Sequence, residues 1–299
     1  MKKVLLASTA LLLSAGFASA QSIELSGSAN AGLKYNSDAT VAEGEVNFAN
    51  EVNMVITGSG TSDTGLEFGA FIDIDEDSVD DAEVFISGTF GTVTVGAIDP
   101  ASDVFGLADV GFDGIGIDDI AEQYKNATGG ADVLYSFSAS GFTFNASAEI
   151  GDAQSIAASI QYDAGVFSAG IGYIDDVNFD NVAGVGDNST ITVAAGFSQG
   201  PISANALYSD WDGGTTAGGQ GYGLDVSYDA GVAKITAVYT HSEGVAADAA
   251  DGLGDAYGVG FSAPLGGGLT IAGGVGIVET DAVADGSKTV ADLGFTMSF

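Results

Sequence analysis

The sequence contains no cysteine and no arginine, and its six lysines stand against 41 acidic residues. Without cysteine the chain can form neither a disulfide nor a thiolate metal site. With so few basic residues it cannot bind a nucleic acid, because such binding needs Lys and Arg to displace counterions from the phosphates. A formal net charge of −35 also argues against an ordinary dense soluble core, since the charges must sit in loops, in a water-filled interior or beside a cation.

Long apolar runs are missing after residue 20, although 46% of the residues are hydrophobic. No helix that spans a membrane is expected there, because such a helix needs about 20 mostly apolar residues in a row. The first 20 residues differ: Lys2 and Lys3 precede a mostly apolar stretch, and Ala18-Ser19-Ala20 has the small residues of a cleavage site. We interpret residues 1–20 as a signal peptide, and the alternative is an uncleaved anchor helix. Cleavage would leave four lysines against 41 acids, a net charge of 4 − 41 = −37.

What the chain has in place of long runs is an alternation of apolar and polar residues. Ile23, Leu25 and Leu33 fall on one face of the first segment, while Glu24 and Lys34 fall on the other. A period of two is typical of a β-strand with one apolar and one polar face. The same alternation returns in the segments 133–139, 142–150, 167–173, 202–208, 224–228, 233–239 and 293–299.

Two features indicate that the apolar faces of these segments meet lipid. The segments run for about ten residues, the length that a tilted strand needs to cross a bilayer. Tyrosines also recur near segment ends, as expected for the aromatic girdles of a membrane barrel. A single tyrosine would also suit a soluble sheet, so the repetition is the evidence; the residues are Tyr35, Tyr162, Tyr173, Tyr208, Tyr228 and Tyr239.

The connections between segments alternate in length. Tight turns lie at 140–141, 163–165, 199–201 and 229–231, and longer acidic or glycine-rich loops lie at 175–188, 209–219, 242–254 and 279–287. Short turns on one side and long loops on the other are the layout of outer-membrane barrels. We therefore predict an all-β fold over residues 21–299, a transmembrane antiparallel β-barrel of about 16 strands around an aqueous channel.

One connection is much longer than the others and spans about thirty residues, from 99 to 130. A loop of that length inside a compact domain is usually functional. It is strongly acidic, carrying Asp99, Asp103, Asp109, Asp113, Asp118, Asp119 and Glu122.

Three stretches resemble the general diffusion porins of Gram-negative bacteria, especially those of purple alpha-proteobacteria. Residues 64–70 (Thr-Gly-Leu-Glu-Phe-Gly-Ala) look like the third strand of that family, and residues 86–96 look like the hairpin before its pore loop. Residues 290–295 and the terminal Phe299 look like its closing strand. The resemblance covers the mature chain from end to end, and the order and spacing of the motifs make it specific.

This resemblance implies a homotrimer of sixteen-stranded barrels, each with its third loop folded inward. The segment 99–130 matches that pore-constricting loop in position. In the family, basic side chains on the first two strands face the loop carboxylates, whereas the only inward lysines that alternation gives here are Lys34 and Lys234. The constriction is therefore expected to be acidic; its candidate residues are Glu24, Asn30, Glu51, Asn53, Asp99, Asp103, Asp109, Asp113, Asp118 and Asp119.

A calcium site is a weaker expectation. Asp73, Asp75 and Asp77 have the opening spacing of a calcium loop, but Ser78 stands where that loop needs glycine and Val84 where it needs glutamate. We prefer to read 73–83 as an acidic external loop. A looser calcium site there, or at Asp118 and Asp119, stays open because calcium accepts flexible carboxylate cages.

Enzymatic activity is not expected. The single histidine, His241, has no identifiable catalytic partner, and we interpret it as a solvated loop residue.

The predicted function is passive diffusion of ions and small hydrophilic solutes through an outer-membrane channel that prefers cations. The alternative is a secreted calcium-binding β-roll or a surface structural protein, but the Gly-Gly-x-Gly-x-Asp repeat of β-rolls does not occur. Phe299 resembles the signal that barrel-assembly machinery reads.

Overall fold

A computed structural model describes residues 21–38, 44–75, 78–125, 130–150, 154–176, 188–213, 218–245, 253–280 and 286–299. The predicted signal peptide, residues 1–20, lies outside these ranges. The strands are β1 (Ser22–Asn36), β2 (Val46–Thr61), β3 (Glu67–Asp75), β4 (Ser78–Gly88), β5 (Gly91–Ile98), β6 (Ala131–Ala139), β7 (Phe142–Ala148), β8 (Ser155–Asp163), β9 (Phe167–Asp176), β10 (Asn188–Gln199), β11 (Ile202–Asp212), β12 (Gly218–Asp229), β13 (Lys234–Val245), β14 (Gly254–Gly266), β15 (Leu269–Thr280) and β16 (Lys288–Ser298). One short helix, α1 (Asp119–Glu122), lies between β5 and β6.

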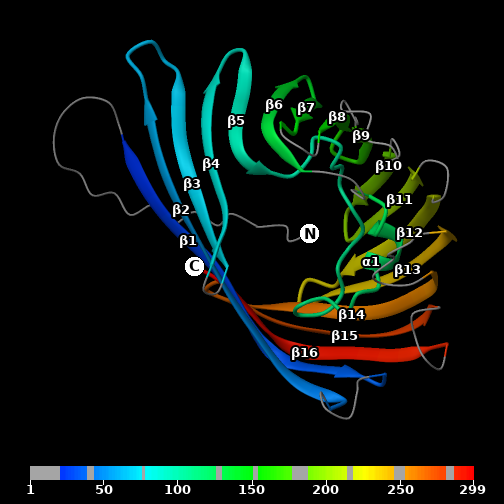
Figure 1. Ribbon diagram of the computed structural model, residues 1–299. Coiled ribbons are helices and arrows are strands. Elements are labelled where there is room, and N and C mark those ends of the chain that lie inside the picture. The colour runs from blue at the N-terminus through cyan, green and yellow to red at the C-terminus, as the bar shows by residue number, and fades with distance from the viewer. Residues whose placement is uncertain are drawn as a thin grey trace.

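The sixteen strands form one closed barrel in which every strand pairs antiparallel with its neighbours in sequence (Figure 1). Closure is made between β1 and β16, where Ala31 lies opposite Phe295. The last residue completes this seam, because Phe299 N–H donates to Gly27 O (3.0 Å) and Gly27 N–H donates to Phe299 O (2.8 Å). The predicted strand number and antiparallel order are therefore confirmed. No helix among the described residues is long and apolar enough to cross a membrane.

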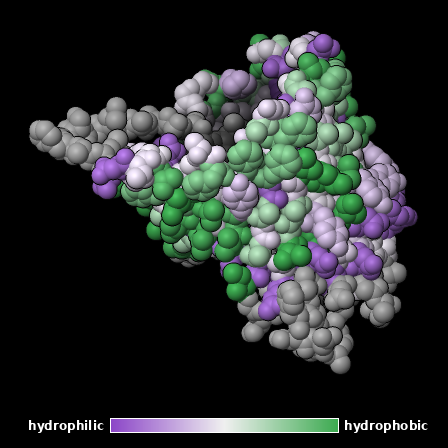
Figure 2. All heavy atoms as spheres, turned by 90° about the horizontal axis from the view of Figure 1, so that it is seen from above, coloured by the Kyte–Doolittle hydropathy of each residue, from purple (hydrophilic) through white to green (hydrophobic). Residues whose placement is uncertain are grey.

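The alternation of the sequence places apolar side chains on the outside of the barrel. Ile23 is 77% exposed and Phe48 is 70% exposed, whereas inward neighbours such as Ser26 are buried. Figure 2 shows such apolar side chains gathered side by side on the outer face. A soluble protein rarely exposes an apolar surface this extensive, so this face is suited to lipid. The outward Tyr162, Tyr173 and Tyr228 lie near strand ends, as the sequence predicts, whereas Tyr208 and Tyr239 lie further inside β11 and β13.

The two ends of the barrel differ. The end at which β1 begins and β16 ends has short turns, such as 140–141 and 200–201, and the other end has the longer connections. One exception corrects the sequence analysis: 73–83 is not an external loop. Asp73 and Asp75 belong to β3 and Glu83 to β4, so only residues 76 and 77 separate these strands. The period of two continues through Phe71, Asp73 and Asp75. The two aspartates therefore face the lumen as part of β3.

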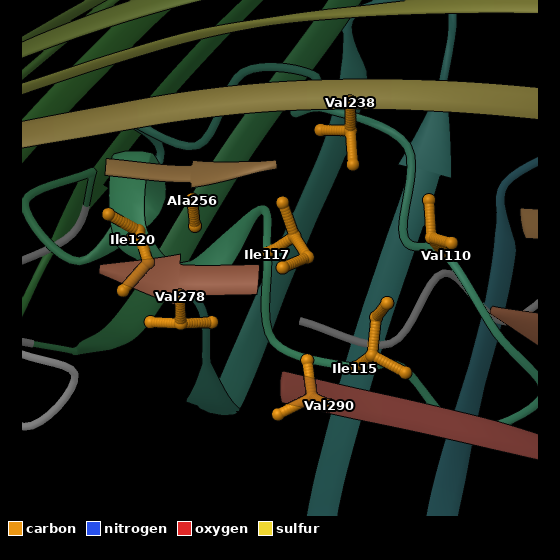
Figure 3. Close-up of a cluster of buried hydrophobic side chains, with 8 residues drawn as sticks. All are labelled: Val110, Ile115, Ile117, Ile120, Val238, Ala256, Val278 and Val290. Atoms are coloured by element: carbon orange, nitrogen blue, oxygen red, sulfur yellow. The ribbon is translucent and has the colours of Figure 1, made fainter. Parts of the chain in front are cut away.

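The long connection, residues 99–130, is here called the inner loop; its residues 99–125 lie inside the barrel and hold half of the buried apolar side chains of the described residues. Ile115, Ile117 and Ile120 of this loop point toward residues of four consecutive strands (Figure 3). Those wall residues are Val238 on β13, Ala256 on β14, Val278 on β15 and Val290 on β16. Two further clusters join Val104, Leu107 and Ala101 to the wall from β8 to β11. Burying an isoleucine as fully as Ile117 contributes about 1.5–3 kcal/mol.

Inward-facing glycines make room for this loop. A Cβ on Gly172 of β9 would overlap the Ser102 carbonyl oxygen, and one on Gly221 of β12 would overlap the carbonyl oxygen of Ala121. Similar overlaps with loop side chains would arise at Gly219, Gly223, Gly260, Gly276 and Gly294. The glycines of the sequence thus have a role beyond turns: they let the loop backbone lie directly against the wall.

Candidate functional site

Two buried wall carboxylates hold the backbone of the inner loop. Asp292 on β16 accepts hydrogen bonds from the backbone N–H groups of Phe112 (2.8 Å), Asp113 (3.3 Å) and Gly274 (2.8 Å). Asp225 on β12 accepts one from Ala108 N–H (2.9 Å) and is itself held by the Asn205 amide (2.9 Å). Hydrogen bonds to a charged acceptor are stronger than neutral ones, so these two side chains fix the position of the loop.

Neutral wall side chains add further attachments around the barrel. Ser147 on β7 accepts a hydrogen bond from Ala101 N–H (2.8 Å). Thr192 on β10 donates to Lys125 O (3.3 Å), and Thr240 on β13 donates to Ile117 O (2.5 Å). The loop is therefore bound along its length from β7 to β16 by the inward positions that alternation makes polar.

The loop meets the first two strands at Asp113. Asn30 on β1 donates to Asp113 Oδ1 (2.8 Å) and more weakly to Glu51 Oε2 (3.4 Å), and Asn53 donates to Glu51 Oε1 (2.7 Å). Lys34 forms an ion pair with Asp113 (Nζ to Oδ2 2.7 Å). Four of the predicted constriction residues, Asn30, Glu51, Asn53 and Asp113, thus form one connected cluster. Lys34 neutralises one loop carboxylate, and Glu51 is the wall carboxylate of the cluster.

A second acidic group lies beside this cluster. Asp109, Asp113, Asp118 and Asp119 line a cavity of about 440 Å³ between the inner loop and the wall, together with Lys34 and Lys288. Loss of water around Asp118, together with the nearby Asp109 and Asp119, raises the pKa of that carboxyl to about 8. Desolvation, reinforced by Asp119, raises the pKa of Asp109 to about 6. Both groups belong to the loop and not to a spanning strand.

The inner loop also contains a buried cation. Lys125 is only 3% exposed, and its Nζ lies 2.9 Å from Asp103 Oδ1 and 3.6 Å from Glu122 Oε2. Glu122 also accepts a hydrogen bond from Leu107 N–H (2.6 Å). Lys125 compensates part of the charge of these two carboxylates within the loop, so Asp103 is part of the loop's internal structure.

The remaining predicted constriction residues lie apart from both groups. Glu24 faces the lumen six residues before Asn30 on β1, which is about 20 Å along a strand. Asp99 is exposed at the start of the inner loop. Lys234 lies in the inward phase of β13, beside the short turn that follows Asp229. The structure thus divides the predicted ring into separate groups at different depths.

The calcium expectation stays untested, and the histidine expectation needs a correction. No group of three or more His, Cys, Asp or Glu side chains suited to a metal ion occurs among the described residues. Asp77 lies outside them. Calcium binding at Asp73, Asp75, Asp77, Asp118 or Asp119 therefore stays a prediction. His241 is not a loop residue: it lies within β13, its ring contacts that of Tyr222 in a tilted arrangement, and its Nδ1 lies 3.1 Å from Asp255 Oδ1.

Sequence reasoning missed Lys125, Asp225 and Asp292. Alternation did give a signal for the last two, because both occupy inward positions of predicted strands. Their partners are backbone N–H groups of a loop distant in sequence, and periodicity does not reveal these. Lys125 carries no periodic signal, since it lies in the irregular part of the inner loop.

Comparison with known proteins identifies this arrangement. Residues 7–283 match the family model described as Gram-negative porin. The chain belongs to the Gram-negative porin family. It is 30% identical to the porin of Rhodobacter capsulatus over 315 aligned positions, which cover 93% of this chain and all of that protein.

Solved structures agree with this assignment. A porin structure refined at 1.8 Å resolution has 26% identity and a TM-score of 0.70, covering 93% of this chain and all of the other. An engineered Rhodopseudomonas blastica porin with 21% identity and a TM-score of 0.72, at the same coverage, shows the same fold. The predicted family is confirmed. Membership makes this porin an outer-membrane channel of a Gram-negative bacterium, and a secreted β-roll is not favoured.

Proposed function

We propose that this porin passes cations in preference to anions. The observation that supports the proposal is the balance of charge around the inner loop. Of the four lysines after residue 20, Lys34 and Lys125 are already ion-paired with loop carboxylates. Four further carboxylates lie beside the lumen, namely Glu51, Asp109, Asp118 and Asp119. The cavity that the three aspartates line contains Lys288 in addition to Lys34. A ring of carboxylates attracts cations and repels anions.

The range of these charges is sufficient to act on permeating ions. The Debye length is about 8 Å at physiological salt, comparable with a narrow pore, so wall charges act on ions within it. Carboxylates on the outer rim would add a field that concentrates cations at the mouth. Two effects oppose this preference, namely the raised pKa of Asp109 and Asp118 and the pairing of Asp113 with Lys34. Neither adds positive charge, so neither reverses the sign.

The test is the zero-current potential of reconstituted channels across a KCl gradient. We expect the sign that reports K⁺ preference, and we expect the preference to weaken as salt rises. Glu51→Lys should shift the potential toward chloride, whereas Glu51→Gln should shift it less, because one variant reverses the charge and the other removes it. A wild-type potential that reports chloride preference would overturn the proposal.

Further proposals follow from the family. We propose that the chain is exported with cleavage after Ala20, that it assembles as a homotrimer, and that Phe299 is recognised by barrel-assembly machinery. Mass determination of the mature protein tests the first of these, since an intact residue Met1 would contradict it. The activity that we propose for the assembled channel is passive diffusion of ions and small hydrophilic solutes, without catalysis.

A further inference from the structure

A second cavity lies at the opposite end of the lumen from the acidic one. It has a volume of about 380 Å³ and lies between Phe105 of the inner loop and the wall near the short turns. Its other lining residues are Gly141, Thr143, Gln161, Tyr162, Asp163, Ser168 and Asn205. We call this cavity the neutral nook. Its size falls within the range of small-molecule sites, roughly 300–1,000 Å³.

The polar side chains of the neutral nook are hydroxyls and amides. Thr143, Gln161, Ser168 and Asn205 stand on β7, β8, β9 and β11, all in the inward phase of their strands. Asp163 is the only charged lining residue, and its Oδ1 already accepts a hydrogen bond from Gly165 N–H (2.6 Å) in the turn. In a chain with a net charge of −35, a stretch of lumen lined by a single carboxylate and otherwise by neutral groups is a distinct chemical environment.

A glycine forms the floor on which these groups converge. Gly196 of β10 lies between Ser168 and Asn205, and a Cβ there would overlap Ser168 Oγ and lie 3.2 Å from Asn205 Oδ1. The Phe105 ring lies 3.6 Å from the same point. The side chains of three different segments therefore meet over the space that glycine leaves open.

The groups around that floor are held in place. The Asn205 amide nitrogen donates to both oxygens of Asp225 (3.2 and 2.9 Å), so its carbonyl oxygen is the end turned toward Gly196. Phe105 packs against the buried cluster that includes Val104 and Leu107. Fixed side chains lose little conformational entropy when a ligand binds.

We propose that the neutral nook is a subsite for an uncharged polyhydroxylated solute, such as one ring of a sugar. Hydroxyl and amide groups both donate and accept hydrogen bonds, as sugar hydroxyls do, whereas charged lining residues would favour ions. The phenyl face of Phe105 offers an apolar surface to the C–H face of such a ring. The proposal goes beyond ion preference and requires only that the channel be open.

The test uses single channels reconstituted in planar bilayers with maltotriose as the probe. We expect maltotriose to produce a saturable increase in current noise, because binding interrupts the ion flow for the time that the sugar stays. Added from the side of the short turns, it should act at lower concentration than from the other side. A polyethylene glycol of similar size is the control, and it should reduce the current without saturation.

Variants then locate the site. Thr143→Val with Ser168→Ala removes two hydroxyls without touching the inner loop, and it should raise the half-saturating maltotriose concentration by about fivefold or more. Phe105→Leu should do the same, while Phe112→Leu, where the loop lies against β1 and β16, should not. The zero-current potential of the double variant should equal that of the wild type, which separates this result from failure of the cation proposal. Noise that does not saturate, or a half-saturating concentration unchanged in the double variant, would overturn the inference.

Discussion

Asp225 and Asp292 are the residues on which the position of the inner loop depends most directly. Each is buried, with exposed fractions of 1% and 7%, and each accepts backbone N–H groups of the loop. A buried carboxylate that lost these donors would be costly, because its desolvation would no longer be compensated. The loop and the wall charges therefore stabilise each other.

Replacing Asp225 by asparagine tests this dependence. Oδ2 accepts from both Ala108 N–H and Asn205, so an amide oxygen there would keep these bonds without the negative charge, while an amide nitrogen in place of Oδ1 would face the Asn205 nitrogen, donor against donor. The loss, roughly 1.5–3 kcal/mol for a hydrogen bond to a charged group, should loosen the loop. We expect more open-channel noise and faster cleavage of the loop by added protease. Asp229→Asn, on the same strand but exposed at the turn, is the control that should change neither quantity.

At the level of single residues, the sequence predicted which side of the barrel a side chain faces better than it predicted which groups that side chain contacts. Alternation correctly placed Asn30, Glu51, Asn53 and Lys34 in the lumen, because a period of two depends only on local backbone geometry. It did not predict that Lys34 pairs with Asp113, or that Lys125 is buried between Asp103 and Glu122. Such pairs depend on how a loop folds over a wall, which local periodicity does not encode.

The strands are the elements that the sequence predicts well, and the inner loop is the element that it predicts only in outline. The length and acidity of 99–130 indicated a functional loop, but its apolar contacts were not foreseen. Val238 and Val278 face inward where a water-filled lumen would favour polar residues, and the structure explains both by the loop packed against them. The inward glycines have the same explanation.

Close approach of the loop to β12 is tested by Gly221→Ala. The added methyl group would overlap the Ala121 carbonyl oxygen, so the loop must move away from the wall and into the lumen. We expect a lower single-channel conductance, measured in 1 M KCl. The matched control is Gly58→Ala on β2, where a Cβ would meet nothing within 4 Å, and its conductance should equal that of the wild type. Equal conductance in both variants would contradict the packing of the loop on β12.

The seam between β1 and β16 makes the role of Phe299 testable. Deleting this residue removes two backbone hydrogen bonds to Gly27, each worth about 1 kcal/mol, and the ring that lies against Gly27. We expect a lower yield of folded, heat-modifiable barrel in the outer membrane. Phe299→Tyr keeps the backbone bonds and an aromatic ring, so it should assemble normally. A full yield from the deletion would show that neither closure nor recognition needs this residue.

For the molecule as a whole, the outer face of the first two strands is suited to contact with another subunit. The outward positions of β1 include the small residues Gly27, Ala29 and Ala31, and the ring of Phe299 lies against Gly27. Asn50 of β2 lies opposite Ala31 on this outward face and is exposed. A polar amide is unfavourable in lipid but can form hydrogen bonds at an interface between subunits.

Asn50→Trp should therefore weaken the proposed homotrimer, because a large side chain would prevent close approach at this face. We expect crosslinking in mild detergent to give three copies for the wild type and mainly monomer for the variant. Val193→Trp, on the outward face of β10, is the control that should remain trimeric. A wild type that stays monomeric in several detergents would contradict the trimer itself.

The pH dependence of ion preference follows from the acidic cavity beside the inner loop. A carboxyl with a raised pKa keeps its proton at pH values where an ordinary aspartate has lost it. Asp109, with a pKa of about 6, and Asp118, with a pKa of about 8, therefore become negative only as the pH rises through these values. The K⁺ preference, read from the zero-current potential in a KCl gradient, should increase in two steps between pH 5 and pH 9. Asp118→Asn should abolish the upper step and keep the lower one, while Asp63→Asn, in the exposed turn after β2, should keep both. A potential that stays constant from pH 5 to pH 9 would show that the cavity lies outside the path of the ions.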